Sequence, residues 1–544
     1  MTTTTLTRPL SFAGLPAGSW AFAIRTWIAV VVALAVSFWL DLEAPSSAAV
    51  TVALLAAPTR GPALEKASYR VLGTVVGVTA SIAITALFSQ TRDLLLAAFA
   101  VWIGLCVFAA GLLDGSRAYA AVLSGYTVAI IAIQQIDSPG HVFESSMARG
   151  AAILVGIAAI TIVNDVLAHP DNHPQLASRL AALQRRVRDY ANALVENAAA
   201  DLATAAQLLR DIAALRPEIT TLAAESASGA ARGAAARNTA VALVAEVYAA
   251  RALRALPATA DAAVRETAAL DLNRRDDEVR AGLAALNQST RPPRTRRMPL
   301  FRSYRAAVAA GLRATLWVAL ISPLYVLAGW PAAAVSFSLI LVVIGLGATT
   351  PDPRAFTIVA FLASPLSALL AGTLEFLVLD GVTELPLLAL ALAPFVIGTT
   401  LAKTSPHPVI AGIGRICLIF GIVILNPANP QVYDPDSFLF ASVFLCTATA
   451  LMVAVQFVIP PASGESRQGW LLASARRDFA HVLSGHNRGL APEEAMFRDA
   501  TRIAQIMAAG KSSPAVAEAL AYFDRAAAVR LSRATAALPR EASS

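Results

Sequence analysis

Long apolar runs separated by short polar segments fall into two groups along this chain. A bilayer core about 30 Å thick needs about 20 apolar residues in helical conformation. The first group therefore predicts six membrane spans, at residues 22–40, 46–58, 69–88, 94–113, 118–136 and 145–168. The second group predicts six more, at residues 306–328, 331–349, 355–379, 385–402, 407–426 and 437–460. The run at 46–58 is short, so we expect this span to be tilted, broken or re-entrant.

The pattern changes between the two groups and after the second one. Residues 174–290 are rich in alanine and charged residues, with apolar positions at the helical spacing of three and four. The first such positions are Leu180, Leu183, Val187, Tyr190 and Leu194. This pattern predicts amphipathic helices in water. Residues 291–297 form a basic linker, and a polar helical tail follows Pro460 and Pro461.

We therefore expect an all-α polytopic membrane protein with two pseudo-repeated six-helix transmembrane blocks. Ala44-Pro45 and Trp330-Pro331 each open the second span of a block, which indicates a parallel repeat of the kind found in transporters. A cytoplasmic helical domain separates the blocks, and a cytoplasmic helical tail ends the chain. The expected boundaries are 1–21 for the cytoplasmic N-terminus, 22–168 for the first block, 169–305 for the helical domain with its linker, 306–460 for the second block and 461–544 for the tail.

Charges in the short loops predict the orientation. If the N-terminus is cytoplasmic, the cytoplasmic loops and helix ends hold six basic residues, whereas the opposite loops hold only Arg92. The six are Arg60, Lys66, Arg70, Arg117, Arg354 and Lys403. Because short cytoplasmic loops carry an excess of lysine and arginine, both termini and both large polar regions are expected in the cytoplasm.

Composition excludes several classes of protein. The chain is 57% hydrophobic and 15% charged, whereas soluble proteins are about 25% charged. The net charge of +7 fits cytoplasmic surfaces that face anionic lipid, so no nucleic-acid partner is expected. The three cysteines and six histidines are scattered, and Gly510-Lys511-Ser512 lacks the first glycine of a P-loop because Gln505 stands there. We expect no enzyme, no metal and no cofactor.

Two arginines inside the spans suggest an anion-binding site. Arg415 lies near the centre of the 407–426 span, where a charge is costly, and Arg149 lies about one turn into its span. The nearby span positions offer no acid as a partner, so an anionic substrate is a candidate counter-charge. A guanidinium binds a carboxylate through two parallel hydrogen bonds. Snorkelling to the interface is the alternative for Arg149, and a helix bridge is the alternative for Arg415.

Other polar and aromatic residues extend this hypothesis. Tyr126 and Thr127 belong to an unusually polar fifth span, and Trp102 lies deep in the fourth. We expect them to line the substrate path, with an aromatic belt as the alternative for the aromatic residues. Asp165 is a candidate for proton coupling, although it lies near the cytoplasmic end of its span, where a hydrated helix end is the simpler interpretation.

The stretch from Pro58 to Gly77 is predicted to shape the cytoplasmic entrance. A charged turn that contains Arg60 leads into a helix expected to begin at about Ser68. That helix starts with Tyr69 and Arg70 and carries Thr74 beside two glycines. Gly73 and Gly77 are four residues apart, which allows close approach of another helix. A plain cytoplasmic hairpin with a packing face is the alternative.

These motifs resemble the fusaric acid resistance family, the aromatic acid exporters of bacterial inner membranes. The resemblance rests on Pro58-Thr59-x-Gly61, on Tyr69-Arg70-x-x-Gly73-Thr74-x-x-Gly77, on Tyr119 and Thr127, and on Arg149 followed by Gly156 and His169-Pro170. It covers the first block well and the whole chain in layout, but the second block lacks the signature. The layout is also similar to plant malate-type anion channels.

The resemblance implies efflux of small aromatic carboxylic acids across the bacterial inner membrane, driven by the proton gradient. It also implies a periplasmic adaptor protein as partner, and a homo-oligomer stays open. On this hypothesis Arg149 and Arg415 bind the carboxylate. Two alternatives remain from the sequence: a passive anion channel and a non-transporting membrane scaffold.

Overall fold

The structure is a computed structural model that describes most of the chain between residues 11 and 537. Outside the description lie residues 1–10, 13, 137, 168–172, 197–201, 227, 258, 260, 329–332, 351, 380, 383, 432, 486–488, 511–512 and 538–544. The described residues are almost entirely helical, apart from a two-residue antiparallel pair, β1 (Ser11–Phe12) and β2 (Leu15–Pro16). The chain forms two compact units, residues 1–170 with 307–461 and residues 171–306 with 462–544.

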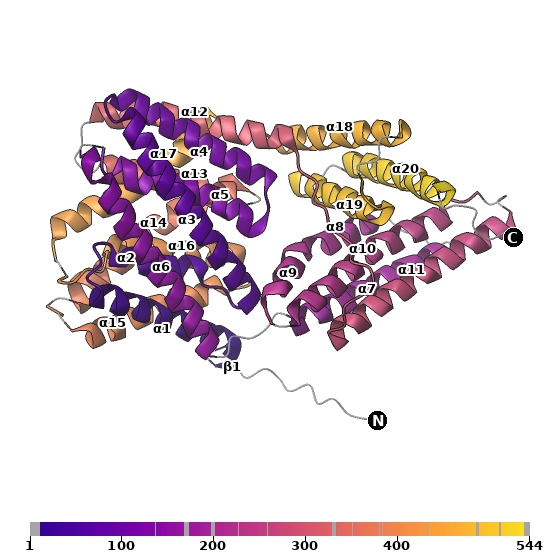
Figure 1. Cartoon of the computed structure of the whole chain (residues 1–544), viewed down its shortest axis with the longest axis horizontal. Coiled ribbons are helices and arrows are strands. Elements are labelled where there is room, and N and C mark those ends of the chain that lie inside the picture. The colour runs from indigo at the N-terminus through magenta and orange to yellow at the C-terminus, as the bar shows by residue number, and fades with distance from the viewer. Residues whose placement is uncertain are drawn as a thin grey trace. The chain divides into compact units, whose positions relative to one another are not determined.

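The first unit contains the apolar helices (Figure 1). The helices of the first block are α1 (Ala17–Trp39), α2 (Pro45–Leu55), α3 (Arg60–Phe88), α4 (Arg92–Leu112), α5 (Gly115–Val128) and α6 (Val142–Val166). Those of the second block are α12 (Tyr304–Ala328), α13 (Ala333–Ala348), α14 (Pro353–Thr373), α15 (Leu385–Lys403), α16 (Pro408–Leu425) and α17 (Pro435–Val458). The expected all-α polytopic membrane fold is confirmed.

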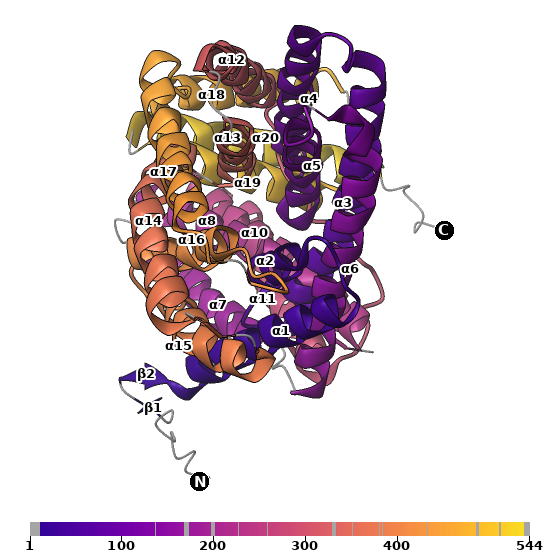
Figure 2. The same cartoon turned by 90° about the vertical axis from the view of Figure 1, so that its left-hand side faces the viewer.

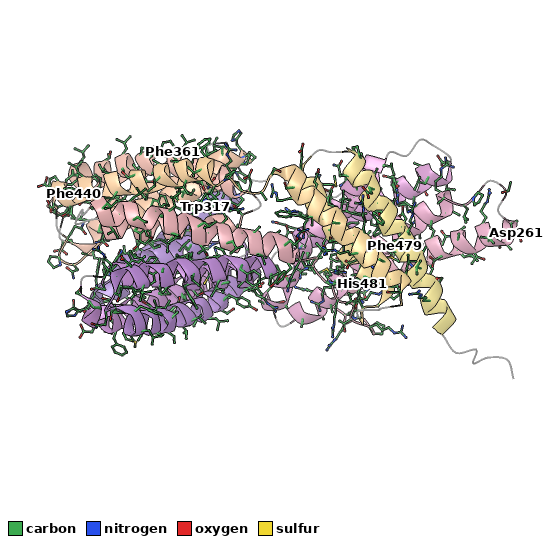
Figure 3. The ribbon with its side chains drawn as sticks, turned by 90° about the horizontal axis from the view of Figure 1, so that it is seen from above. Asp261, Trp317, Phe361, Phe440, Phe479 and His481 are labelled. Carbon is green, nitrogen blue, oxygen red and sulfur yellow. The ribbon has the colours of Figure 1, made fainter. Side chains whose placement is uncertain are left out.

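Ten of the described helices are long and apolar enough to cross a membrane. The second helix of each block, α2 or α13, is apolar but shorter. Large apolar side chains such as Phe361 and Phe440 are exposed on the surface of this unit, as expected where a protein meets lipid (Figure 3). A water-soluble unit rarely exposes so much contiguous apolar surface.

The start of α3 differs from its expected position. The sequence predicted a turn up to about Ser68, but α3 begins at Arg60. Pro62 falls in the first turn of this helix, where proline is tolerated because the N–H groups there have no helical partner. Lys66 is therefore a helical residue whose side chain has a fixed direction.

Helices of the two blocks pack against each other within this unit. Helix α2 packs against α6 of its own block and α16 of the other, and α13 packs against α17 of its own block and α5 of the other. Helices α1 and α15 also lie side by side. Figure 2 shows the first block, in indigo and purple, and the second, in salmon and orange, on opposite sides of the unit.

Two glycines allow α3 and α5 of the first block to approach each other closely. A Cβ atom on Gly73 would lie 2.7 Å from the carbonyl oxygen of Ala120, and one on Gly77 would lie 2.7 Å from Cβ of Thr127. Larger residues would clash at both positions. The glycines therefore set the separation of the two helices.

The second unit is a bundle of polar helices with its own core. Its helices are α7 (His173–Val195), α8 (Leu202–Ala214), α9 (Arg216–Thr221), α10 (Gly229–Arg254), α11 (Ala262–Gln288), α18 (Gly464–Leu483), α19 (Pro492–Ala509) and α20 (Ser513–Ala537). The apolar face predicted for α7 is confirmed, because all five of its spaced residues are buried. Helix α10 is buried along most of its length.

Ion pairs join the central and C-terminal helices of this unit. Arg251 on α10 donates two hydrogen bonds to Asp524 on α20, of 3.1 and 2.5 Å. Arg275 on α11 contacts Glu493 on α19 at 2.9 Å. Both arginines are largely buried, so these pairs are shielded from water. Residues separated by more than 200 positions thus belong to one folded body.

A buried carboxyl group lies between α7, α10 and α11. Glu246 on α10 is 1% exposed, and none of the described residues donates a hydrogen bond to its buried Oε2 atom. The pKa of Glu246 is raised to about 8, mainly by burial and also by nearby Asp276, whereas Arg188 and Arg280 partly oppose the shift. Because Asp276 already binds both arginines, Glu246 gains little from them.

Replacing Glu246 with glutamine is expected to stabilise the protein above pH 8. A carboxyl group with a raised pKa binds its proton more tightly when folded, so wild-type stability falls between about pH 4.5 and 8. The neutral amide removes this loss, which is at most about 5 kcal/mol. The Tm of the full-length variant should exceed that of the wild type at pH 9 and match it at pH 5. Glu266→Gln, on an exposed face of α11, should leave the pH profile unchanged. A variant with the wild-type profile would contradict the assignment.

Candidate functional site

A cavity of about 620 Å³ lies inside the first unit. At one end it reaches Glu43 and Asp434, in the connections that precede α2 and α17. At the other end it stops at Leu54 and Leu346, close to the C-terminal ends of α2 and α13. Its walls are mostly apolar, with Phe420 and Phe438 among them, and a few polar groups point inward. Pockets that hold small organic molecules have this size and composition.

Arg70 forms part of the deep end of the cavity. Its side chain is 4% exposed and joins three helices. The guanidinium of Arg70, on α3, donates to the hydroxyl of Tyr119 on α5 and, over 2.9 Å, to the hydroxyl of Thr51 on α2. The Tyr126 hydroxyl lies near the same guanidinium. These contacts hold the positively charged guanidinium of Arg70 at the end of the cavity.

Arg149 lines the cavity from α6 and lies within electrostatic range of Arg70. No described residue forms a hydrogen bond or ion pair with Arg149. Tyr126 and Thr127 on α5 line the same cavity. The two guanidinium groups thus face a space that has one aromatic wall and a hydroxyl group, a suitable set of partners for an aromatic carboxylate.

Two π-helical turns border the cavity. One, η1 (Ala129–Ile133), continues α5 and contributes Ile130, and the other, η4 (Leu374–Val378), continues α14 and contributes Glu375. Glu375 is 4% exposed, and its buried Oε2 atom has no hydrogen-bond partner among the described residues. Turns of this kind occur frequently at functional sites.

Beyond the deep end, two lysines hold the C-terminal end of α2. Lys66 on α3 donates to the carbonyl of Leu54, and Lys403 at the end of α15 donates to the carbonyl of Ala56 over 2.7 Å. A helix as short as α2 leaves its last carbonyls without helical partners. In an apolar environment these carbonyls need other donors. The ammonium groups supply the donors and also favour the negative end of the helix dipole.

Positive charge accumulates around this end of the cavity. Lys66 lies within electrostatic range of Lys403, Arg415 and Arg70. The guanidinium of Arg415 is 6.0 Å from the ring of Phe356. None of these four residues, nor Arg149, forms an ion pair with any residue that the structure describes. Charges in a membrane protein are costly without an opposite charge nearby, so this region is suited to a negatively charged ligand.

Comparison with known proteins identifies the family. A model of the fusaric acid resistance protein family matches residues 19–269 and 234–544, which together include almost all of the chain. This chain belongs to the fusaric acid resistance protein family. The resemblance inferred from the sequence is therefore confirmed.

Individual relatives are similar over shorter stretches. An uncharacterized transporter, YdhK, of Salmonella typhimurium is 30% identical over 179 residues, which are 32% of this chain and 26% of that protein. An uncharacterized transporter of Gluconobacter oxydans is 34% identical over 142 residues, 25% of this chain and 19% of that protein. The p-hydroxybenzoic acid efflux pump subunit AaeB of Musicola paradisiaca is 29% identical over 167 residues, 29% of this chain and 26% of that protein.

The matched segments thus span about a quarter or less of the length of these curated relatives. No solved structure matches the chain. The family assignment therefore rests on the family model, and the geometry described above gives this family member its candidate site.

Not all of the residues expected from the sequence lie at the cavity. Arg149, Tyr126, Thr127 and Arg70 line it, whereas Arg415 and Trp102 do not. The Trp102 indole donates to the carbonyl of Ser124 over 3.3 Å, so it takes part in the packing of α4 on α5. Arg415 lies beside the two lysines instead.

The remaining expected residues occupy the surroundings. Gly73 and Gly77 face α5, and Thr74 is buried without lining the cavity. The Tyr69 hydroxyl accepts a hydrogen bond of 2.9 Å from Arg117. Asp165 is exposed near the end of α6. The side chain of Arg60 and the His169-Pro170 motif lie outside the described residues.

The role of the two lysines was not identified from the sequence, and Glu375 was not singled out. One signal was present: the chain has only three lysines, at 66, 403 and 511, among 43 basic residues. A lysine has a compact, strongly hydrated charge, and its choice over arginine at two membrane positions is unusual in this composition. The sequence does not show that both lysines bind carbonyls at the C-terminal end of α2, because this depends on how α3 and α15 pack against it.

Proposed function

We propose that this family member exports small aromatic carboxylates across the bacterial inner membrane. The observation that carries the proposal is the cavity with Arg70 and Arg149 at its walls, continued by three further cations that have no acidic partner among the described residues. Neutral substrates would leave this charge uncompensated. A carboxylate compensates it, and the apolar walls with Phe420 and Tyr126 accommodate a ring.

In the proposed binding step, Arg149 supplies the fork of hydrogen bonds to the carboxylate. Arg70 is held by Tyr119 and Thr51 and contributes fixed positive charge. Thr127 is placed to bind a ring hydroxyl, and Tyr126 to contact the ring. Arg415 is proposed to attract the anion from its position beside Lys66 and Lys403, and not from the cavity wall.

The lysine contacts support a role for the end of α2 as the cytoplasmic gate. By the loop charges, the α2–α3 connection faces the cytoplasm and the cavity opens to the other side. Lys66 and Lys403 then close the cytoplasmic end by binding carbonyls of α2. A carboxylate from the cytoplasm competes for the same ammonium groups, which links substrate arrival to release of α2.

The packing of the two blocks supports the parallel repeat that we predicted from the sequence. The contacts α2–α6 and α2–α16 have counterparts in α13–α17 and α13–α5, in the order that a two-fold relation between the blocks requires. Transporters built from such repeats alternate between states by rocking one part against the other. We include this motion in the proposal.

We further propose that Glu375 carries the coupled proton. It is a buried acid on the cavity wall, whereas Asp165, the acid expected from the sequence, is exposed and does not line the cavity. Its carboxyl group on the cavity wall is placed to take up and release a proton as the cavity changes sides.

Glu375→Gln is expected to abolish uphill export while leaving downhill movement of the substrate. The glutamine side chain has nearly the same shape but cannot exchange a proton. Export should be measured in proteoliposomes with and without an imposed pH gradient. Asp165→Asn is the matched variant and should retain acceleration by the gradient. The opposite result, with Asp165→Asn uncoupled and Glu375→Gln normal, would return the coupling role to Asp165.

The function itself is tested with the full-length wild type in proteoliposomes loaded with labelled p-hydroxybenzoate. Gradient-driven loss of label, competed by other aromatic acids but not by their neutral esters, is the expected result. Flux that follows voltage and continues without a pH gradient would indicate the channel alternative. Absence of flux for every aromatic acid would favour the scaffold alternative. Adding a periplasmic adaptor would then test whether the protein works as one part of a larger pump.

A further inference from the structure

A second cavity, of about 310 Å³, lies in the other unit. One wall consists of the segment that leads into α12, with Arg302, and the first turn of α12, with Arg305. The other wall is α18, with Trp470 and Arg477. His481, labelled in Figure 3, is also on α18 at this cavity. The transport proposal does not use this site.

The cavity is strongly positive. Four arginines line it, Arg302, Arg305, Arg477 and Arg498, against one carboxylate, Asp478. Asp478 already binds Arg498 at 2.9 Å and also Arg502. A charge of about +3 therefore remains at the described walls when histidine is neutral. A cluster of guanidinium groups in a concave space is suited to a phosphate, whose oxygens match their planar fork of donors.

The floor of the site is packed, and its rim is exposed. Arg498 and Asp478 are each 12% exposed, and the Arg498 guanidinium lies 5.3 Å from the ring of Phe301. This contact holds the floor of the cavity in one geometry. Arg302, Arg305 and Arg477 are exposed at the rim of the cavity, where a ligand from outside can reach their guanidinium groups.

The chain joins both walls directly to membrane spans. Arg302 and Arg305 flank Tyr304, the first residue of the span 304–327. Helix α18 begins six residues after the span that ends at Val458. Tyr304 is 65% exposed, and Trp470 is partly exposed. Tyrosine and tryptophan are enriched where a protein meets lipid headgroups, and clustered arginines beside a span attract anionic lipids.

We propose that this cavity binds the phosphate headgroup of an anionic phospholipid. The guanidinium groups bind the phosphate oxygens, and Trp470 and Tyr304 contact the adjoining glycerol and upper acyl region. A free phosphate compound has the same charge but no need for aromatic residues at the rim. The aromatic residues and the adjoining spans therefore favour the lipid as the source of the phosphate.

The test uses purified full-length protein and native mass spectrometry with phosphatidylglycerol or phosphatidylcholine added. Wild type should retain one phosphatidylglycerol with at least about tenfold preference over phosphatidylcholine. The variant Arg302→Gln/Arg305→Gln/Arg477→Gln should lose that preference. Arg186→Gln/Arg210→Gln/Arg476→Gln removes the same charge from exposed positions outside the cavity and should keep it.

Three results would overturn the proposal. Equal loss in both triple variants would mean that only total charge matters. Competition by millimolar inorganic phosphate, without any preference between lipids, would identify a site for a soluble anion. Retained preference in the folded cavity variant would place the lipid elsewhere. If the triple variant does not fold, the single change Arg477→Gln, at an exposed side chain, should weaken phosphatidylglycerol binding, and an unchanged affinity would contradict the site.

Discussion

Replacing Arg149 with glutamine is expected to lower the rate of aromatic acid export by at least about tenfold. A hydrogen bond to a charged group contributes about 1.5–3 kcal/mol, and every 1.4 kcal/mol is about a tenfold change. Because no described residue forms a hydrogen bond or ion pair with Arg149, its replacement breaks no such interaction among the described residues and should not reduce the amount of folded protein. The measurement is the initial rate of efflux from proteoliposomes across a range of substrate concentrations.

Two further variants separate charge from geometry. Arg149→Lys keeps the charge but loses the two-pronged hydrogen bond, so it should fall between wild type and Arg149→Gln. Arg92→Gln removes an exposed arginine at the start of α4, outside the cavity, and should transport normally. Wild-type rate and KM in Arg149→Gln would exclude Arg149 from substrate binding.

Gly73→Val is expected to have the largest effect on stability. Its Cβ would lie 2.7 Å from the carbonyl oxygen of Ala120, and a backbone atom in a packed helix has little room to move. Forcing extra atoms into packed interiors costs about 1–3 kcal/mol and occasionally more. We expect the upper end of this range, because α3 and α5 would have to separate along their whole contact. The Tm of purified protein and its yield from membranes report the change.

A glycine elsewhere provides the matched comparison for this variant. A Cβ on Gly398 in α15 would meet no atom within 4 Å, so Gly398→Val should behave like the wild type. Adding Gly77→Val to Gly73→Val should lower the yield further. Equal Tm values for Gly73→Val and Gly398→Val would show that α3 and α5 do not approach as closely as described.

Much of the membrane fold followed from the sequence, because lipid imposes a simple length rule on apolar helices. The predicted start of α3 was wrong. Arg60, Glu65 and Lys66 form a charged sequence of the kind found in turns, but their backbone is helical. The pairing of Arg251 with Asp524 could not be predicted from the sequence. Such long-range pairing depends on how helix surfaces fit together, which local periodicity does not encode.

The candidate site was predictable only in part, for a related reason. Arg149 attracted attention because an arginine in a span needs a partner, and Tyr126 and Thr127 because they are polar for their depth. The same rule selected Arg415, but depth does not tell which face of α16 a residue occupies. Glu375 was not singled out because it lies near the end of its expected span, 355–379, where contact with water is usual, whereas the fold buries it.

The π-helical turns in α5 and α14 have a consequence for how substrate preference can change. An α-helix rotates by roughly 100° per residue, and a π-turn accommodates one extra residue without interrupting the helix. Deleting one residue from η1 would rotate the helix beyond it and turn Gln134 toward a different neighbour. Deleting one residue from η4 would do the same for the residues that follow Glu375. A single codon insertion or deletion can therefore change which polar side chains line this cavity, without any substitution in the neighbouring residues.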